Sequence, residues 1–213
     1  MSWYNKARQK DWRVRLSVWW TCIFTLFLVL MCGCYKPEMR IPEREAFIPP
    51  PKPFKPQIPK IAAELERLDT RYWKYIVIHH SASNADNAAS MDKYHREVRG
   101  WENGLGYHFV IGNGSNSGDG QIEIGCRWLH QINGAHAGND EYNQYGIGIC
   151  LVGNFEDDNP TEVQLRSLIE LVHYLQQRCN IPFENIIMHR HVKHTACPGK
   201  NFPYYELLAH LAQ

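Results

Sequence analysis

The hydrophobic pattern of the 213-residue chain changes character at about residue 61. From there to residue 213, short apolar and β-branched runs alternate with stretches in which apolar residues recur every three or four positions. Short runs of this kind are typical of strands, and the longer spacing is typical of helices that bury one face. The alternation predicts a mixed α/β domain over residues 61–213.

Five segments have the pattern of strands. The run YIVIH at 75–79 is apolar on both faces, as expected for a strand in the middle of a sheet. The runs at 107–111 and 121–124 flank the sequence GNGSNSGDG, which favours a hairpin. A second buried strand is predicted at 146–152, and a last short one at 184–188.

Three segments have helical signals. We expect a helix over 90–99, with Ser90 as its N-cap. A long helix is predicted after Thr161, which forms a capping box with Gln164, and it should end before Asn180. A terminal helix is expected over residues 204–211.

The first 34 residues look like a targeting segment. Residues 1–15 are rich in Lys and Arg, and residues 16–31 are uncharged and mostly apolar, which is the anatomy of a secretory signal. The apolar stretch is short for a bilayer span of about 20 residues. It ends in the sequence MCGC, so we expect a lipoprotein signal with lipid attachment at Cys34, although MCGC departs from the usual lipobox. An uncleaved membrane anchor is the alternative.

Residues 35–60 separate this segment from the domain. They contain eight of the twelve prolines and no apolar period. Because proline fixes φ and removes a donor, such a segment behaves as a semi-rigid spacer with a reach of up to roughly 75 Å. We expect a linker here, either an extended arm or a disordered connection.

Charge and cysteine content exclude some classes of protein. Lys and Arg number 23 against 22 for Asp and Glu, so no global electrostatic field attracts nucleic acid. We also expect a monomer. Cys150 is predicted to be a small buried residue. The cysteines of the domain show no paired spacing, although Cys126 and Cys179 could form a disulfide in an oxidising compartment.

Potential zinc ligands lie at the ends of two predicted strands. His79 ends the first strand, and His189 and Cys197 belong to the segment MHRHVKHTACPGK after the last one. A catalytic zinc needs three protein ligands and an open fourth position, and this set meets that requirement. Side chains alternate along a strand, so only one of His79 and His80 can reach the metal. The pattern alone does not choose between them.

Four segments carry a resemblance to a known family. YIVIHHSAS, LGYHFVIGNG, GAHAGNDEYNQYGIGICLVGNF and MHRHVKHTACPG resemble, in this order, the peptidoglycan recognition protein and type 2 amidase family. The match covers nearly all of residues 75–199. It implies a central mixed β-sheet flanked by helices. It also implies a zinc-dependent N-acetylmuramoyl-L-alanine amidase, which hydrolyses the amide between muramic acid and the L-alanine of the stem peptide.

The resemblance also assigns residues to roles. It implies one Zn²⁺ per chain, with His79, His189 and Cys197 as ligands. Tyr107 and Thr195 match residues that line the family's active site, and their hydroxyl groups could stabilise an oxyanion.

Two further residues are candidates for contact with peptidoglycan or muropeptides. His136 belongs to a block that lines the family's substrate groove, although a hydrogen bond that orders the loop is the alternative. Trp128 offers a flat face for a sugar or a peptide, or else it belongs to the core.

Two other functions stay open. Family members that lost the cysteine recognise peptidoglycan without cutting it, so Cys197 favours catalysis over binding alone. A closed structural zinc site would need His191 or His194 as a fourth ligand. Combined with the N-terminal segment, the resemblance predicts an enzyme at the bacterial cell envelope, tethered to the membrane and facing the periplasm.

Overall fold

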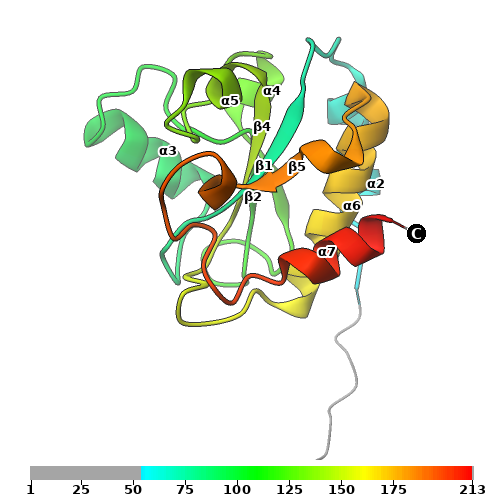
Figure 1. Ribbon diagram of the computed structural model, residues 1–213. Coiled ribbons are helices and arrows are strands. Elements are labelled where there is room, and N and C mark those ends of the chain that lie inside the picture. Colours follow the sequence, from blue (N-terminus) through cyan, green and yellow to red (C-terminus); the bar gives the residue numbers. More distant parts are fainter. Residues whose placement is uncertain (1–53, 213) are drawn as a thin grey trace, which may run out of the picture. The chain divides into compact units, whose positions relative to one another are not determined.

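Figure 1 shows a computed structural model of the protein, which describes residues 54–212. Its centre is a five-stranded sheet in the order β3-β2-β4-β1-β5. β1 is parallel to both β4 and β5, β2 is parallel to β4, and β3 is antiparallel to β2. The strands are β1 (Tyr75–His80), β2 (Phe109–Ile111), β3 (Ile122–Ile124), β4 (Gly146–Leu151) and β5 (Ile186–Met188). The mixed sheet and its flanking helices confirm the expected fold class.

Six α-helices and two short 3-10 helices complete the described part of the chain. The α-helices are α2 (Ile58–Glu66), α3 (Ala88–Glu97), α4 (Cys126–Leu129), α5 (Asp140–Tyr145), α6 (Glu162–Cys179) and α7 (Tyr204–Leu211). The 3-10 helices are η2 (Phe183–Asn185) and η3 (His189–His191). None of the helices in residues 54–212 combines the length and the apolar character needed to cross a membrane.

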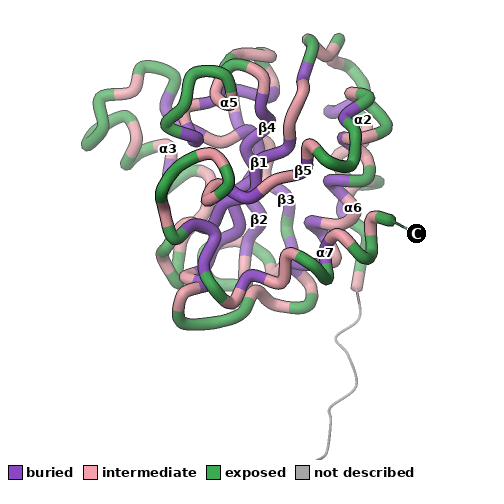
Figure 2. Tube along the Cα trace, in the orientation of Figure 1, coloured by how far each residue is buried: buried purple, intermediate pink, exposed green. Residues whose placement is uncertain are grey.

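The larger hydrophobic core lies between the sheet and α6, with α2 and α7 beside that helix (Figure 1). The apolar residues of α6 recur at helical spacing and face alternate residues of the central strands. On the sheet these are Ile76, Ile78, Phe109, Ile111, Ile147, Ile149 and Leu151. The central strands are therefore buried along their length (Figure 2).

The opposite face of the sheet carries a much smaller apolar cluster. Met91 of α3 packs there with Leu105, Val110, Cys150 and Val152. Besides Val77 of β1, several of the remaining inward positions on this face are polar or lack a side chain. His79 on β1, His108 before β2 and Gly148 on β4 are the main examples. This face is where a polar site can form.

Several boundaries differ from those expected, each for a local reason. α3 is capped by Asn87, not by Ser90: the two side chains form a capping box in which Ser90 is the third helical residue. β2 begins at Phe109 because the His108 imidazole, through Nδ1, accepts the N–H of Gly148. Phe183–Asn185 form a 3-10 turn, which shortens the last strand to β5.

The N-terminal expectations are only partly within the described residues. The segment 1–34, with Cys34, and the linker up to residue 53 lie outside them. Helix α2 already begins at Ile58, and the carboxylate of Glu170 on α6 accepts the N–H groups of Gln57 and Ile58 at 2.7 and 3.0 Å. The folded part therefore starts before residue 61.

Candidate metal centre and surrounding cavity

His79 and His189 are brought together by the register of two parallel strands. Ile78 of β1 is paired with Met188, the last residue of β5, so the residues that follow them in the chain, His79 and His189, lie at the same end of the sheet. Their ring centroids are 4.5 Å apart. His80 points to the other face, where its Nδ1 accepts the N–H of Phe155 at 3.1 Å. The structure therefore selects His79 from the HH pair.

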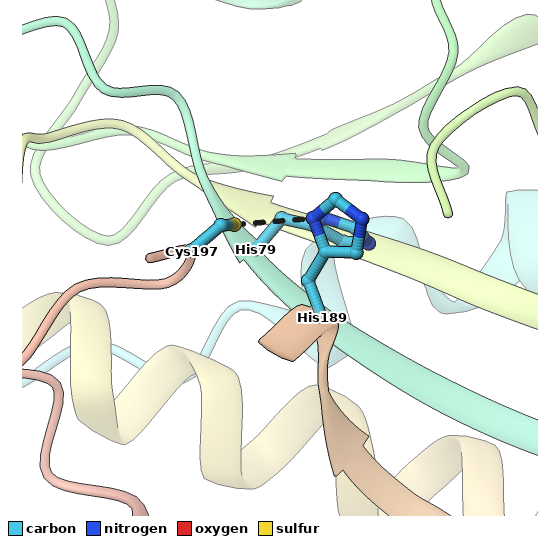
Figure 3. Close-up of side chains that lie close together, drawn as sticks. All are labelled: His79, His189 and Cys197. Carbon is cyan, nitrogen blue, oxygen red and sulfur yellow. Dashed lines mark hydrogen bonds between the residues drawn. The ribbon is translucent and has the colours of Figure 1, made fainter. Parts of the chain in front are cut away.

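Cys197 completes the cluster from the loop after η3. Its Sγ lies 3.7 Å from Nδ1 of His79 (Figure 3), and one potential ligand atom from each of the three residues lies within 4.8 Å of the others. With Zn–N near 2.1 Å and Zn–S near 2.3 Å, a tetrahedral zinc would separate the two atoms by about 3.6 Å. The separation of His79 and Cys197 therefore fits a shared zinc ion, and His189 places its own ligand atom within 4.8 Å of both.

The chemistry of the donor atoms agrees with this fit. Burial lowers the pKa of His79 well below its ordinary value, and it also lowers the pKa of His189, so both rings are neutral and can donate a lone pair. Burial raises the pKa of the Cys197 thiol to about 11, while the N–H of His80 donates to its Sγ at 3.4 Å. A cation placed between these residues would favour the thiolate.

No fourth side chain closes the cluster within residues 54–212. Neither His191 nor His194 belongs to the group of His, Cys, Asp and Glu residues that could hold a metal ion. His191 instead packs edge-on against Tyr204. Three protein ligands with an open position are typical of a catalytic site, so the closed structural site has no support here.

Tyr107 lies directly beside the candidate metal cluster. Its ring centroid is 5.2 Å from that of His79, and its side chain lines the adjoining cavity. Burial, with the nearby thiols of Cys150 and Cys197, raises the pKa of Tyr107 well above 10. The hydroxyl is therefore protonated at neutral pH and can donate a hydrogen bond.

Thr195 orders the turn that carries the cysteine. Its Oγ1 accepts the N–H of Cys197 at 3.3 Å. The hydroxyl hydrogen is left to donate elsewhere, but Thr195 is not among the residues that line the cavity.

A cavity of about 400 Å³ opens next to the cluster. Two cationic side chains, Arg99 and Lys193, line it, and none of its lining residues is acidic. The complete lining is His95, Arg99, Trp101, Tyr107, Ala135, His136, Gly138, Asn143, His189 and Lys193. Apart from Tyr107, His136 and His189, the sequence analysis missed these residues. Arg99 lies in an exposed segment outside the four motifs, and Lys193 lies within the last motif but between the residues that the motif marks.

Trp128 is not available to a substrate. Its side chain is fully buried, stacked on Trp73 with a centroid separation of 6.3 Å and packed against Phe109 at 4.9 Å. The expectation that Trp128 contacts sugar or peptide is therefore wrong, and the alternative of a core residue holds. The helical turn of α4 directs the ring inward, which the sequence pattern did not reveal.

His136 reaches the site from the loop before α5. It is 8% exposed, and its Nδ1 lies 3.0 Å from Nε2 of His79. Its own Nε2 lies 3.2 Å from the carbonyl oxygen of Gly146. His136 therefore lines the cavity but uses both ring nitrogens for contacts within the protein.

The other cysteines, and the two glutamates nearest in sequence to the motifs, have ordinary structural surroundings. Cys126, Cys150 and Cys179 are free thiols, so the disulfide considered between Cys126 and Cys179 is not present. The carboxylate of Glu123 accepts the N–H of Ala88 at the start of α3. Neither Glu123 nor Glu141 lines the cavity.

Comparisons with known proteins agree with this site. Residues 69–200 match the family model described as N-acetylmuramoyl-L-alanine amidase. Peptidoglycan-recognition protein SC2 of Drosophila melanogaster is 35% identical over 139 residues, which are 61% of this chain and 70% of that protein. The N-acetylmuramoyl-L-alanine amidase of Sus scrofa is 31% identical over 137 residues, which are 59% of this chain and only 21% of that protein.

Solved structures give the same result. The N-acetylmuramoyl-L-alanine amidase LysC from Clostridium intestinale URNW superposes with a TM-score of 0.58 and 36% identity, covering 66% of this chain and 85% of that one. A mutant of Drosophila PGRP-LB in complex with tracheal cytotoxin superposes with a TM-score of 0.52 and 27% identity, covering 64% of this chain and 83% of that one.

Proposed function

The chain belongs to the N-acetylmuramoyl-L-alanine amidase family, and on this premise we propose that it is a zinc-dependent hydrolase of peptidoglycan. The bond that it cuts is the amide between muramic acid and the L-alanine of the stem peptide. The observation that supports this most strongly is the convergence of His79, His189 and Cys197 beside a cavity that Tyr107 also lines.

The proposed roles follow from the side chains. His79, His189 and Cys197 hold one zinc ion through two neutral imidazoles and a thiolate. Zinc bound by such a set lowers the pKa of a coordinated water toward about 7 and polarises an amide carbonyl. Tyr107 donates its hydroxyl hydrogen to the carbonyl oxygen as negative charge develops there. Thr195, whose O–H is left to donate, is the proposed second donor.

The charge of the cavity supports a peptide as part of the substrate. Arg99 and Lys193 are cationic, and no acidic side chain lines the same space. Stem peptides carry carboxylates, which these two residues attract and orient. The carboxylate contacts would hold the peptide so that its first amide lies next to Tyr107.

A second candidate function is peptidoglycan recognition without cleavage. It is favoured by relatives that are named recognition proteins, such as SC2 of Drosophila melanogaster. The complete set of two histidines and one cysteine, with no side chain in the fourth position, favours the hydrolase.

The metal and the activity can be tested together. We expect purified full-length protein to contain one zinc per chain and to release stem peptide from muropeptides, and a chelator should abolish the release. Cys197→Ser should lose zinc and activity. Cys179→Ser should keep both, because this half-buried thiol is the last residue of α6 and does not belong to the cluster. A wild-type protein that binds muropeptides but holds no zinc and releases no peptide would refute the hydrolase and favour recognition.

The proposed location rests on the N-terminal sequence. We propose that Cys34 carries a lipid and that the proline-rich residues between Cys34 and the start of the folded part extend the enzyme from the membrane toward peptidoglycan in the periplasm.

A further inference from the structure

Both histidine ligands contact the same short segment of chain, residues Gly134–Gly138. Nε2 of His79 lies 3.0 Å from Nδ1 of His136, and Nε2 of His189 lies 3.1 Å from the carbonyl oxygen of Ala137. His136 and Ala137, which are neighbours in the chain, therefore contact His79 and His189 respectively. Each contact is made at Nε2 of the ligand.

The hydrogen-bond partners determine which nitrogen carries the proton. A carbonyl oxygen only accepts, so Nε2 of His136 must donate to Gly146. The ring of His136 is 8% exposed and no acidic side chain lines the cavity beside it, so it has no counter-ion and is neutral, which leaves Nδ1 as an acceptor. His79 must then donate from Nε2, and its lone pair is on Nδ1, the atom that faces Cys197. By the same reasoning, Ala137 leaves the lone pair of His189 on Nδ1.

The surrounding fold reserves space for the His136 ring. An added Cβ on Gly148 of β4 would lie 2.5 Å from Cδ2 of His136, and one on Gly134 would be closer still. Neither glycine has a positive φ, so their contribution is the missing side chain and not backbone freedom. The two glycines form a slot that holds the ring in one position.

The segment is also fixed along its backbone. Oδ1 of Asn143, on α5, accepts the N–H groups of His136 and Ala137 at 2.9 and 2.8 Å. The N–H of Gly134 donates to the carbonyl oxygen of Asn143, and that of Ala135 donates to Gly106. Three of the segment's backbone N–H groups are therefore paired with Asn143.

We propose that Gly134–Gly138 is the positioning element of the metal site: His136 and Ala137 orient both histidine ligands and fix the tautomer that presents Nδ1 to the cation. This proposal rests on the proposed function, because it requires a metal at the cluster. His136 is then a positioning residue and not the substrate contact expected from the sequence. Partners of this kind around a metal ligand are worth 10- to 100-fold in metal affinity.

A pair of similar-sized substitutions separates the hydrogen bond from packing. Asn at position 136 can place an oxygen close to the Nδ1 position, whereas Leu has the same branching but no acceptor, and both lose the bond to Gly146. We expect His136→Leu to weaken zinc binding about 10- to 100-fold and His136→Asn to restore much of the loss. Competition with a chromophoric chelator measures the affinity, and the visible spectrum of the Co²⁺ form reports the ligand geometry.

Gln164→Leu is the matched control. It removes a buried polar side chain that also bonds two backbone groups, the carbonyl oxygens of Ile111 and Val152, but that contacts neither histidine ligand nor the segment Gly134–Gly138. We expect it to lower the melting temperature while leaving the zinc affinity and the Co²⁺ spectrum of the folded protein unchanged.

Asn143 gives an independent test if His136→Leu does not fold. Asn143→Asp keeps an acceptor for both N–H groups, whereas Asn143→Leu removes it, so only the second should weaken zinc binding. Wild-type affinity and an unaltered Co²⁺ spectrum in His136→Leu or Asn143→Leu would overturn the positioning role while leaving the proposed function intact. A wild-type protein that binds no zinc would overturn both.

Discussion

Replacing Tyr107 with Phe removes one hydroxyl group and keeps the ring that packs 5.2 Å from His79. In the wild type this hydroxyl stays protonated, because burial raises its pKa well above 10. Loss of one donor to a developing oxyanion costs about 2.7 to 4 kcal/mol, which corresponds to roughly 100- to 1,000-fold in kcat. Because the donor acts mainly in the transition state, KM for the muropeptide should change little.

The assay compares kcat, KM and zinc content of Tyr107→Phe with those of the wild type and of Tyr204→Phe. Tyr204 is a suitable control because its hydroxyl donates to the carbonyl oxygen of Ile186, away from the cavity. We expect Tyr107→Phe to keep one zinc per chain, since its hydroxyl is not a ligand atom. If Tyr107→Phe has the same kcat as the wild type, Tyr107 has no part in the mechanism. If Tyr107→Phe loses zinc, the residue supports the metal site instead.

Three further predictions concern the core, the pH dependence and the N-terminus. Trp128→Ala should lower the free energy of unfolding by about 3 to 5 kcal/mol without raising KM in the folded protein. A raised KM together with an unchanged free energy of unfolding in urea would show that Trp128 contacts the substrate. The metal-free protein should lose stability as the pH falls from 6.5 toward about 4, because His79, His108 and His136 have lowered pKa values and take up protons only on unfolding. Each contributes up to about 1.4 kcal/mol per pH unit, and urea unfolding that is independent of pH across this window would contradict the assignment. Cys34→Ala should abolish incorporation of labelled fatty acid in bacteria. Labelling that persists in this variant would show that Cys34 is not the site of lipid attachment.

The elements that sequence analysis found best are those with strong local signals. β1 is apolar on both faces, and that is why it was recognised as a central strand. Helix α6 has a complete capping box at Thr161 and ends at Asn180, which adopts the left-handed conformation. The short helices α4 and α5 were missed because a turn or two of helix has too few residues to show an apolar period.

The candidate site shows the same division. The three residues of the candidate metal cluster could be named because ordered motifs marked them, and the register of β1 against β5 explains how His79 and His189 come together. The contact between His136 and His79 joins residues 57 positions apart, and it depends on strand order and on the missing side chain of Gly148. The burial of Trp128 depends on the direction of a single helical turn. Neither can be derived from a linear pattern.

The bond that is cut provides the most direct test of the central claim. Purified sacculi should be digested with the full-length protein, with and without a chelator, and the products identified by mass spectrometry. We expect free stem peptides that begin with L-alanine bearing a free amino group, together with glycan that keeps its muramic acid, and the chelator should suppress both. Glycan fragments that still carry their peptides, or an absence of products from protein that contains zinc, would contradict the account.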